Sequence, residues 1–144
     1  MRFMMLMIPA GYETAEPDAV QNLDADAAAA MMKYNDELRA AGVLVALDGL
    51  HPPSMGARVS FKGGKPLVTD GPFAEAKEVL GGYWIIDVGS RADAIEWAKR
   101  CPGGENEVIE VRQIQDFADY SPEVQTVIEA YPEMKGRQSA KGGT

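Results

Sequence analysis

The sequence predicts an α+β domain with a ferredoxin-like order: strand, helix, strand, hairpin, strand, helix, strand. Three observations support this. Apolar runs of strand length lie at residues 2–8, 43–47 and 83–88, and a further segment of strand length lies at residues 107–114. Amphipathic stretches of helix length follow the first and third runs, and two alternating segments flank Gly63-Gly64. Such βαβ units place both main helices on one face of one sheet. At 144 residues the chain fits one domain.

The first strand and first helix are defined by their apolar residues. Residues 2–8 are apolar at successive positions, which indicates a strand covered on both faces. Residues 24–41 form a helix whose apolar stripe includes Tyr34 and Leu38. Asp24 favours the N-terminal end of this helix, because the helix dipole attracts negative charge there. A second strand at residues 43–47 follows.

The middle of the chain predicts a β-hairpin. Residues 57–62 alternate, with Val59 and Phe61 on one face. Gly63-Gly64 is a two-residue turn, and residues 65–69 form the return strand.

The second βαβ unit contains the strand at residues 83–88 and a helix that Ser90 caps and that continues through Arg100. Glu96 is spaced for an ion pair with Arg100. The last strand lies at residues 107–114.

The C-terminal part adds a short helix at residues 121–131, which Pro132 is expected to stop. Residues 132–144 then form a flexible tail. We therefore divide the chain into a domain at residues 1–117 and a C-terminal extension at residues 118–144.

One face of the predicted sheet lacks a cover. Both main helices lie on the other face, the first strand is too apolar for a solvated face, and the C-terminal helix is too short to cover a sheet. A second copy of the chain is the economical cover, so we expect a homodimer through the sheet face.

Composition excludes several classes of function. The net charge of −8, with 22 acidic and 14 basic residues, argues against nucleic acid or an anionic membrane as partner. The apolar run near the N-terminus is too short for a signal peptide or a membrane helix, so a cytoplasmic location is expected. One cysteine, Cys101, and one histidine, His51, cannot form the usual metal sites. No phosphate-binding glycine motif occurs, so we expect no metal and no cofactor.

His51 and Asp70 are the candidate catalytic residues. His51 follows the second strand, and its ordinary pKa near 6.5 suits proton transfer at neutral pH. A loop histidine that packs on Pro52 is the structural alternative. Asp70 opens an Asp-Gly-Pro-Phe turn, where its carboxylate can close an Asx-turn by accepting backbone N–H bonds or can orient His51. The two roles of Asp70 are compatible.

Other polar residues are candidates for binding a small organic acid. Lys77 and Arg58 could bind its carboxylate, although Lys77 lies in a charge run that also reads as a solvated face. Asp48 precedes the His51 loop and could pair with His51, although Asp-Gly also simply makes turns. Tyr34 lies on the first helix and could line a pocket, although packing in the core is the alternative role. Five methionines are expected first to fill the core, and they could also form the floor of an apolar pocket between the first strand and the first helix. They are Met4, Met5, Met7, Met31 and Met32.

The stretch VTDGPFAEAKE at residues 68–78, followed by LGGYW at residues 80–84, resembles the signature of the YCII-related, or DGPF, family. Further matching pieces occur in order along the chain, and the likeness covers about residues 1–117. They are Lys33–Asn35, Ala41–Leu44, Gly49–Pro52, Gly56–Val59, Ala94–Pro102 and Glu110–Arg112.

The resemblance implies a dimeric α/β-barrel fold, shared with muconolactone isomerases and with monooxygenases that need no metal or bound cofactor. Some members of the wider superfamily are lyases with a His–Asp pair, and some DGPF relatives are linked to extracytoplasmic sigma factors. In the catalytic relatives the histidine lies early in the first helix, whereas the matching residues 27–32 here hold no titratable side chain.

Three functions therefore stay open from the sequence. The chain is a cofactor-free lyase or isomerase that uses His51 and Asp70, a non-catalytic regulatory or partner-binding module tied to a sigma-factor system, or a plain dimeric scaffold.

Overall fold

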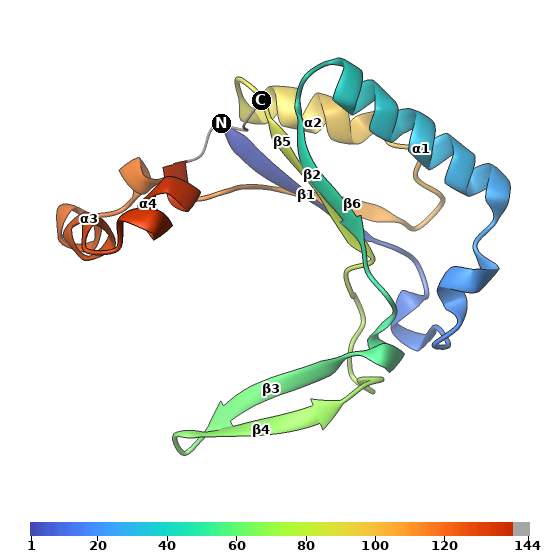
Figure 1. Cartoon of the computed structure of the whole chain (residues 1–144). Helices are drawn as coiled ribbons and strands as arrows, with labels where there is room; N and C mark the ends of the chain where they lie inside the picture. Colours follow the sequence, from blue (N-terminus) through green and yellow to red (C-terminus); the bar gives the residue numbers. More distant parts are fainter. Residues whose placement is uncertain (140–144) are drawn as a thin grey trace.

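The computed structural model describes residues 1–139, in which two helices cover one face of a four-stranded antiparallel sheet (Figure 1). The strands, in spatial order, are β2 (Leu44–Gly49), β5 (Gly82–Asp87), β1 (Arg2–Ile8) and β6 (Val108–Gln113). The helices on that face are α1 (Ala25–Ala40) and α2 (Arg91–Lys99). This arrangement confirms the predicted ferredoxin-like α+β fold.

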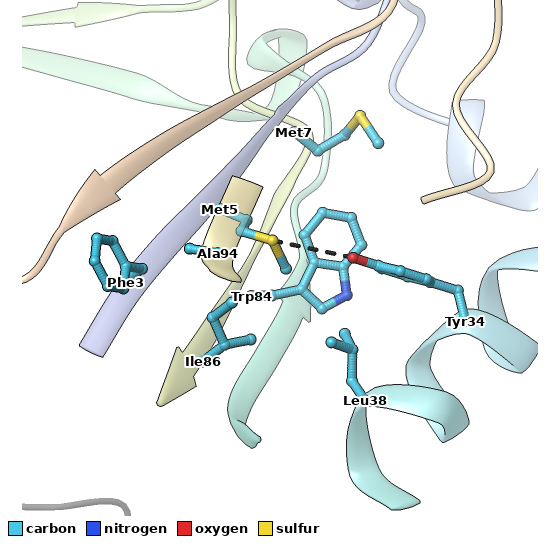
Figure 2. Packing of buried hydrophobic residues seen from close by; sticks show 8 residues of the cluster. All are labelled: Phe3, Met5, Met7, Tyr34, Leu38, Trp84, Ile86 and Ala94. Atoms are coloured by element: carbon cyan, nitrogen blue, oxygen red, sulfur yellow. Dashed lines mark hydrogen bonds between the residues drawn. The ribbon is translucent and has the colours of Figure 1, made fainter. Parts of the chain in front are cut away.

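The core lies between the sheet and the two helices. Side chains of β1 alternate, so that Phe3, Met5 and Met7 are buried against the helices. Trp84 and Ile86 of β5 face the same way, because they pair with Met5 and Phe3 in the register. Figure 2 shows this cluster; its members are Phe3, Met5, Met7, Tyr34, Leu38, Trp84, Ile86 and Ala94.

Local signals place the ends of both helices. The Asp24 carboxylate accepts a hydrogen bond from the Ala27 backbone N–H at 2.9 Å, and Ser90 caps α2 in the same way. The predicted ion pair between Glu96 and Arg100 is wrong. Glu96 pairs with Lys99 at 2.8 Å, whereas Arg100 stacks on Trp97 and reaches Glu37 of α1. Tertiary contacts therefore replaced a local pair of similar strength.

The hairpin stands outside the four-stranded sheet (Figure 1). Its strands are β3 (Ala57–Lys62) and β4 (Lys65–Asp70). Gly63 and Gly64 both have positive φ, as a type I′ turn requires. The predicted turn is therefore confirmed.

The C-terminal part holds two helices, α3 (Pro122–Glu129) and α4 (Pro132–Ser139). Pro132 was predicted to stop the preceding helix, but proline also fits the first position of a helix, and here it begins α4. The rest of the predicted tail, residues 140–144, lies outside the described residues. Short 3₁₀ helices occupy the connecting segments and are η1 (Tyr12–Thr14), η2 (Ala19–Asn22), η3 (Pro53–Met55) and η4 (Phe117–Asp119).

Candidate functional site

A cleft of about 170 Å³ lies where α1 crosses the ends of β2 and β5. Its apolar lining comes from Met7, Met31, Leu47 and Trp84. Met7 and Met31 were predicted to floor such a pocket between the first strand and the first helix, and they line this one. The cleft rests on regular helix and strand residues, which hold a binding site more rigidly than loops do.

Two glycines that face each other across the sheet shape the cleft in different ways: Gly49 leaves space, whereas Gly82 lets β2 approach closely, since a Cβ there would lie 2.9 Å from the Asp48 carbonyl oxygen. Gly49 of β2 and Gly82 of β5 are Cα partners, and Met7 pairs with Gly82 from the other side. By alternation these positions point toward α1, next to Leu47 and Trp84. A Cβ built on Gly49 meets no atom within 4 Å, so the missing side chain leaves open space.

The Asn35 side chain is the fixed polar group of the cleft. Its Oδ1 accepts a hydrogen bond from Trp84 Nε1 at 2.8 Å, and its Nδ2 lies 3.5 Å from Met32 Sδ. Sulfur is a weak acceptor, so the amide N–H groups keep donating capacity. Trp84 is held in turn by Tyr34, whose ring meets it edge-on at 5.8 Å (Figure 2).

Asp48 and Tyr83 border the cleft, but strand alternation sends their side chains to the opposite face of the sheet. There the Tyr83 hydroxyl donates a hydrogen bond to Asp48 Oδ2 at 2.8 Å. This bond and the negative charge of Asp48 raise the pKa of Tyr83, because ionisation would place two anions side by side. The Asp48 carboxylate, a predicted substrate contact, is thus hydrogen-bonded to Tyr83 on the face of the sheet away from α1.

Tyr34, another predicted ligand contact, is a core residue. Its ring is almost fully buried, and its hydroxyl donates to the Trp97 carbonyl at 2.6 Å. Burial raises the pKa of this phenol well above its ordinary value. Tyr34 therefore ties α1 to α2 and supports Trp84 from behind.

The loop that carries His51 is anchored on both sides. The Leu50 N–H donates to the Gly81 carbonyl at 2.9 Å, Tyr12 donates to the Leu50 carbonyl, and Pro52 is fully buried. The His51 side chain itself is exposed. His51 lies two residues beyond Gly49, so its backbone is within about 7 Å of the cleft lining.

The turn that begins at Asp70 packs against the same loop. Gly71 N–H donates to the Gly56 carbonyl at 2.8 Å, and a Cβ on Gly71 would lie 1.8 Å from the Pro53 oxygen. The Asp70 side chain is exposed and, within residues 1–139, accepts no hydrogen bond, so the predicted Asx-turn is not formed. Backbone contacts join the two loops, while the His51 and Asp70 side chains share no hydrogen bond in the described part of the chain.

The two predicted anion-binding residues lie elsewhere. The Arg58 guanidinium stacks 3.9 Å above the centre of the Phe73 ring, and Lys77 is exposed. Neither lines the glycine cleft. A larger hollow of about 470 Å³ borders Phe73, and its charged lining residues are Glu13 and Glu16. The structure therefore places no basic side chain in either cavity.

The described residues contain no cluster of three or more histidine, cysteine, aspartate or glutamate side chains suited to a metal ion. Among the same residues, no helix combines the length and apolar character needed to cross a membrane.

Comparison with known proteins places this chain in a family. The model of the YCII-related domain matches residues 1–118. The chain belongs to the YCII-related family. An uncharacterized protein of Rhizobium meliloti (strain 1021) is 36% identical over 74 residues, which are 51% of this chain and 56% of the relative. The chain thus spans little more than half the length of that curated relative.

The cleft residues that sequence reasoning missed are Gly49, Gly82, Leu47 and Trp84. Gly49 ends β2 and Gly82 begins β5, so each taken alone is an ordinary residue at a strand end. Only the pairing of β2 with β5 shows that two positions without side chains face each other. The hydrogen bond between the Asn35 amide and Trp84 depends on how α1 crosses the sheet, which the sequence around Asn35 does not reveal.

Proposed function

We propose that this YCII-related chain binds a small, largely apolar molecule in the cleft between α1 and the Gly49–Gly82 pair. The observation that carries the proposal is Gly49, whose missing side chain leaves open space beside a fixed indole and a fixed amide. Apolar clefts with a few convergent polar groups are the usual form of small-molecule sites.

The lining limits the class of ligand. An engineered apolar cavity of about 150 Å³ holds benzene, so a cleft of about 170 Å³ suits a ligand of roughly six to ten heavy atoms. The Asn35 amide offers N–H donors, which suit a carbonyl, ether or hydroxyl oxygen. No lysine or arginine lines the cleft, so a neutral ligand fits it better than the organic acid expected from the sequence.

The test is a thermal-shift screen with neutral compounds of up to about ten heavy atoms, on wild type and on Gly49→Leu. The leucine fills the cleft, and its Cβ meets no neighbour within 4 Å. Gly103→Leu is the matched control, because Gly103 also has open space around it. A compound at ten times its Kd adds about 1.4 kcal/mol of stability, or roughly 3–5 °C in Tm.

We expect the shift in wild type and Gly103→Leu and its loss in Gly49→Leu. A compound that stabilises Gly49→Leu as much as wild type would place binding outside the cleft.

The finer proposal is a cofactor-free lyase or isomerase in which His51 transfers a proton and Asp70 orients it. It is supported by the anchored loop that holds His51 near the cleft and by the contact of the Asp70 turn with that loop. In this proposal Arg58 or Lys77 binds a carboxylate of the substrate.

A panel of small carboxylic acids tests the finer proposal on wild type, His51→Ala and Lys77→Ala. Loss of binding in both variants supports it, whereas equal shifts in wild type and His51→Ala would remove His51 as a contact residue. If no compound of either panel binds, the alternative of a regulatory or partner-binding module gains instead.

We further propose that the chain is a homodimer through the face of the sheet opposite α1 and α2. Met4, Leu6 and Ile85 point to that face by alternation, and each remains partly exposed. Monomers rarely leave so central an apolar strip open to water.

Sedimentation of wild type and Leu6→Glu tests the dimer, with Met32→Glu on the outer side of α1 as the control. We expect a dimer for wild type and Met32→Glu and a monomer for Leu6→Glu. A monomeric wild type at all concentrations would refute it.

A further inference from the structure

The β3–β4 hairpin is an arm that its own chain does not cover. All residues of both strands are exposed, and Figure 1 shows the hairpin projecting away from the four-stranded sheet. Its contacts with the rest of the chain lie at its base, where Gly71 bonds to Gly56 and Arg58 stacks on Phe73. A two-stranded hairpin is only marginally stable in water unless one face is packed.

One face of this arm is apolar. Val59 pairs with Val68 and Phe61 pairs with Pro66, so these four side chains share a face. Phe61 is 78% exposed and Val68 is 63% exposed. The other face and the tip carry the cations Arg58, Lys62 and Lys65, in a chain whose net charge is −8. The arm therefore suits a partner with an apolar stripe next to carboxylates.

Helix α3 presents such a surface. Val124 and Val127 lie at i and i+3 on one side of α3, and Tyr131 follows just after the helix; Val127 and Tyr131 are each more than 60% exposed. The charged residues of α3 are Glu123 and Glu129, of which Glu129 pairs with Lys135 of α4 at 3.4 Å. The helix thus offers the apolar stripe and the negative charge that complement the arm.

The arm does not reach α3 of its own chain. Figure 1 shows the hairpin and the α3–α4 pair at opposite ends of the molecule, on either side of the uncovered sheet face. A two-fold axis through that face repeats every contact reciprocally, so a hairpin that reaches the other copy's helices does so twice.

We propose that the apolar face of each β3–β4 hairpin packs on the α3 stripe of a second copy, with the tip cations Lys62 and Lys65 near Glu123. This inference rests on the proposed sheet-face dimer and extends it. It makes the hairpin and the C-terminal extension two halves of one reciprocal contact.

A double-mutant cycle on the dimer Kd tests the pairing. The variants are Phe61→Ser, Val127→Ser and both together, and Leu23→Ser is the control, since Leu23 is an exposed leucine outside both surfaces. Truncating one well-packed interface anchor raises the Kd tenfold or more. Each single substitution alters both reciprocal contacts of the dimer, so it should raise the dimer Kd on the order of a hundredfold. The combined variant should weaken the dimer by clearly less than the product of the single effects, because the two residues share one contact.

Two further measurements keep the outcome clear. Circular dichroism of the diluted, monomeric variants should match wild type, because Phe61 and Val127 are both exposed in the single chain. Hydrogen exchange of the β3 and β4 amides in wild type should slow above the dimer Kd and quicken below it.

The outcomes separate the two proposals. If wild type is a dimer and Phe61→Ser leaves its Kd unchanged, the arm contact is refuted while the sheet dimer stands. If the effects of Phe61→Ser and Val127→Ser simply multiply, the arm does not meet α3. If wild type is a monomer, the sheet dimer fails and the arm contact fails with it.

Discussion

Gly71→Ala should destabilise the protein by about 2–4 kcal/mol. The new Cβ would lie 1.8 Å from the Pro53 carbonyl oxygen, whereas ordinary contacts begin near 3.4 Å, so the two loops must separate by about 1.6 Å. Overpacking of this kind costs about 1–3 kcal/mol. The movement also strains or breaks the hydrogen bond from Gly71 N–H to the Gly56 carbonyl, which contributes about 0.5–1.5 kcal/mol.

Urea unfolding measures this loss, with all variants at one protein concentration because association would shift the midpoint. Gly103→Ala is the control: its Cβ meets no atom within 4 Å, and its cost should stay within about 0.5 kcal/mol. A Gly71→Ala protein as stable as Gly103→Ala would refute the close approach of the two loops. It would also remove the steric reason for glycine in the Asp-Gly-Pro-Phe turn.

Three further predictions concern Tyr83, Cys101 and Leu38. The pKa of Tyr83 should be raised in ¹³C NMR titrations and should fall toward 10 in Asp48→Asn. Because the folded state keeps this proton longer than the unfolded chain, stability should decrease as pH rises above about 10. Burial, aided by the charge of Glu107, raises the pKa of the Cys101 thiol to about 11, so alkylation at pH 8 should be much slower than in urea. Leu38→Ala should cost about 2–5 kcal/mol by urea unfolding, because Leu38 is fully buried.

The sequence predicted the parts of the fold that depend on local patterns. The Ser90 cap, the glycine turn of the hairpin and the apolar first strand follow from residues close together in the chain. Arg100 was assigned the wrong partner because its guanidinium finds Trp97 and Glu37, which belong to a contact between helices. The role of Pro132 was ambiguous, because a proline can stop one helix and can also occupy the first position of the next.

The candidate site was harder to predict because it depends on the register in which neighbouring strands pair. His51 and Asp70 were identified by residue type, and the structure brings their loops together through backbone atoms without joining their side chains. The cleft depends on Gly49 facing Gly82, which follows from the pairing of β2 with β5. No local pattern in the sequence carries that information.

Gly49 offers a test of whether the cleft is a site or a packing defect. Glycine inside a strand costs about 0.5–1 kcal/mol relative to alanine, and a Cβ at Gly49 would meet no neighbour within 4 Å. A plain scaffold would therefore gain stability from alanine at this position, so glycine here sacrifices stability for space. We expect Gly49→Ala to raise the free energy of unfolding by about 0.5–1 kcal/mol and to weaken binding of any compound found by the screen. A Gly49→Ala protein that is less stable than wild type would show that the backbone needs glycine there, and the main argument for a binding site would fail.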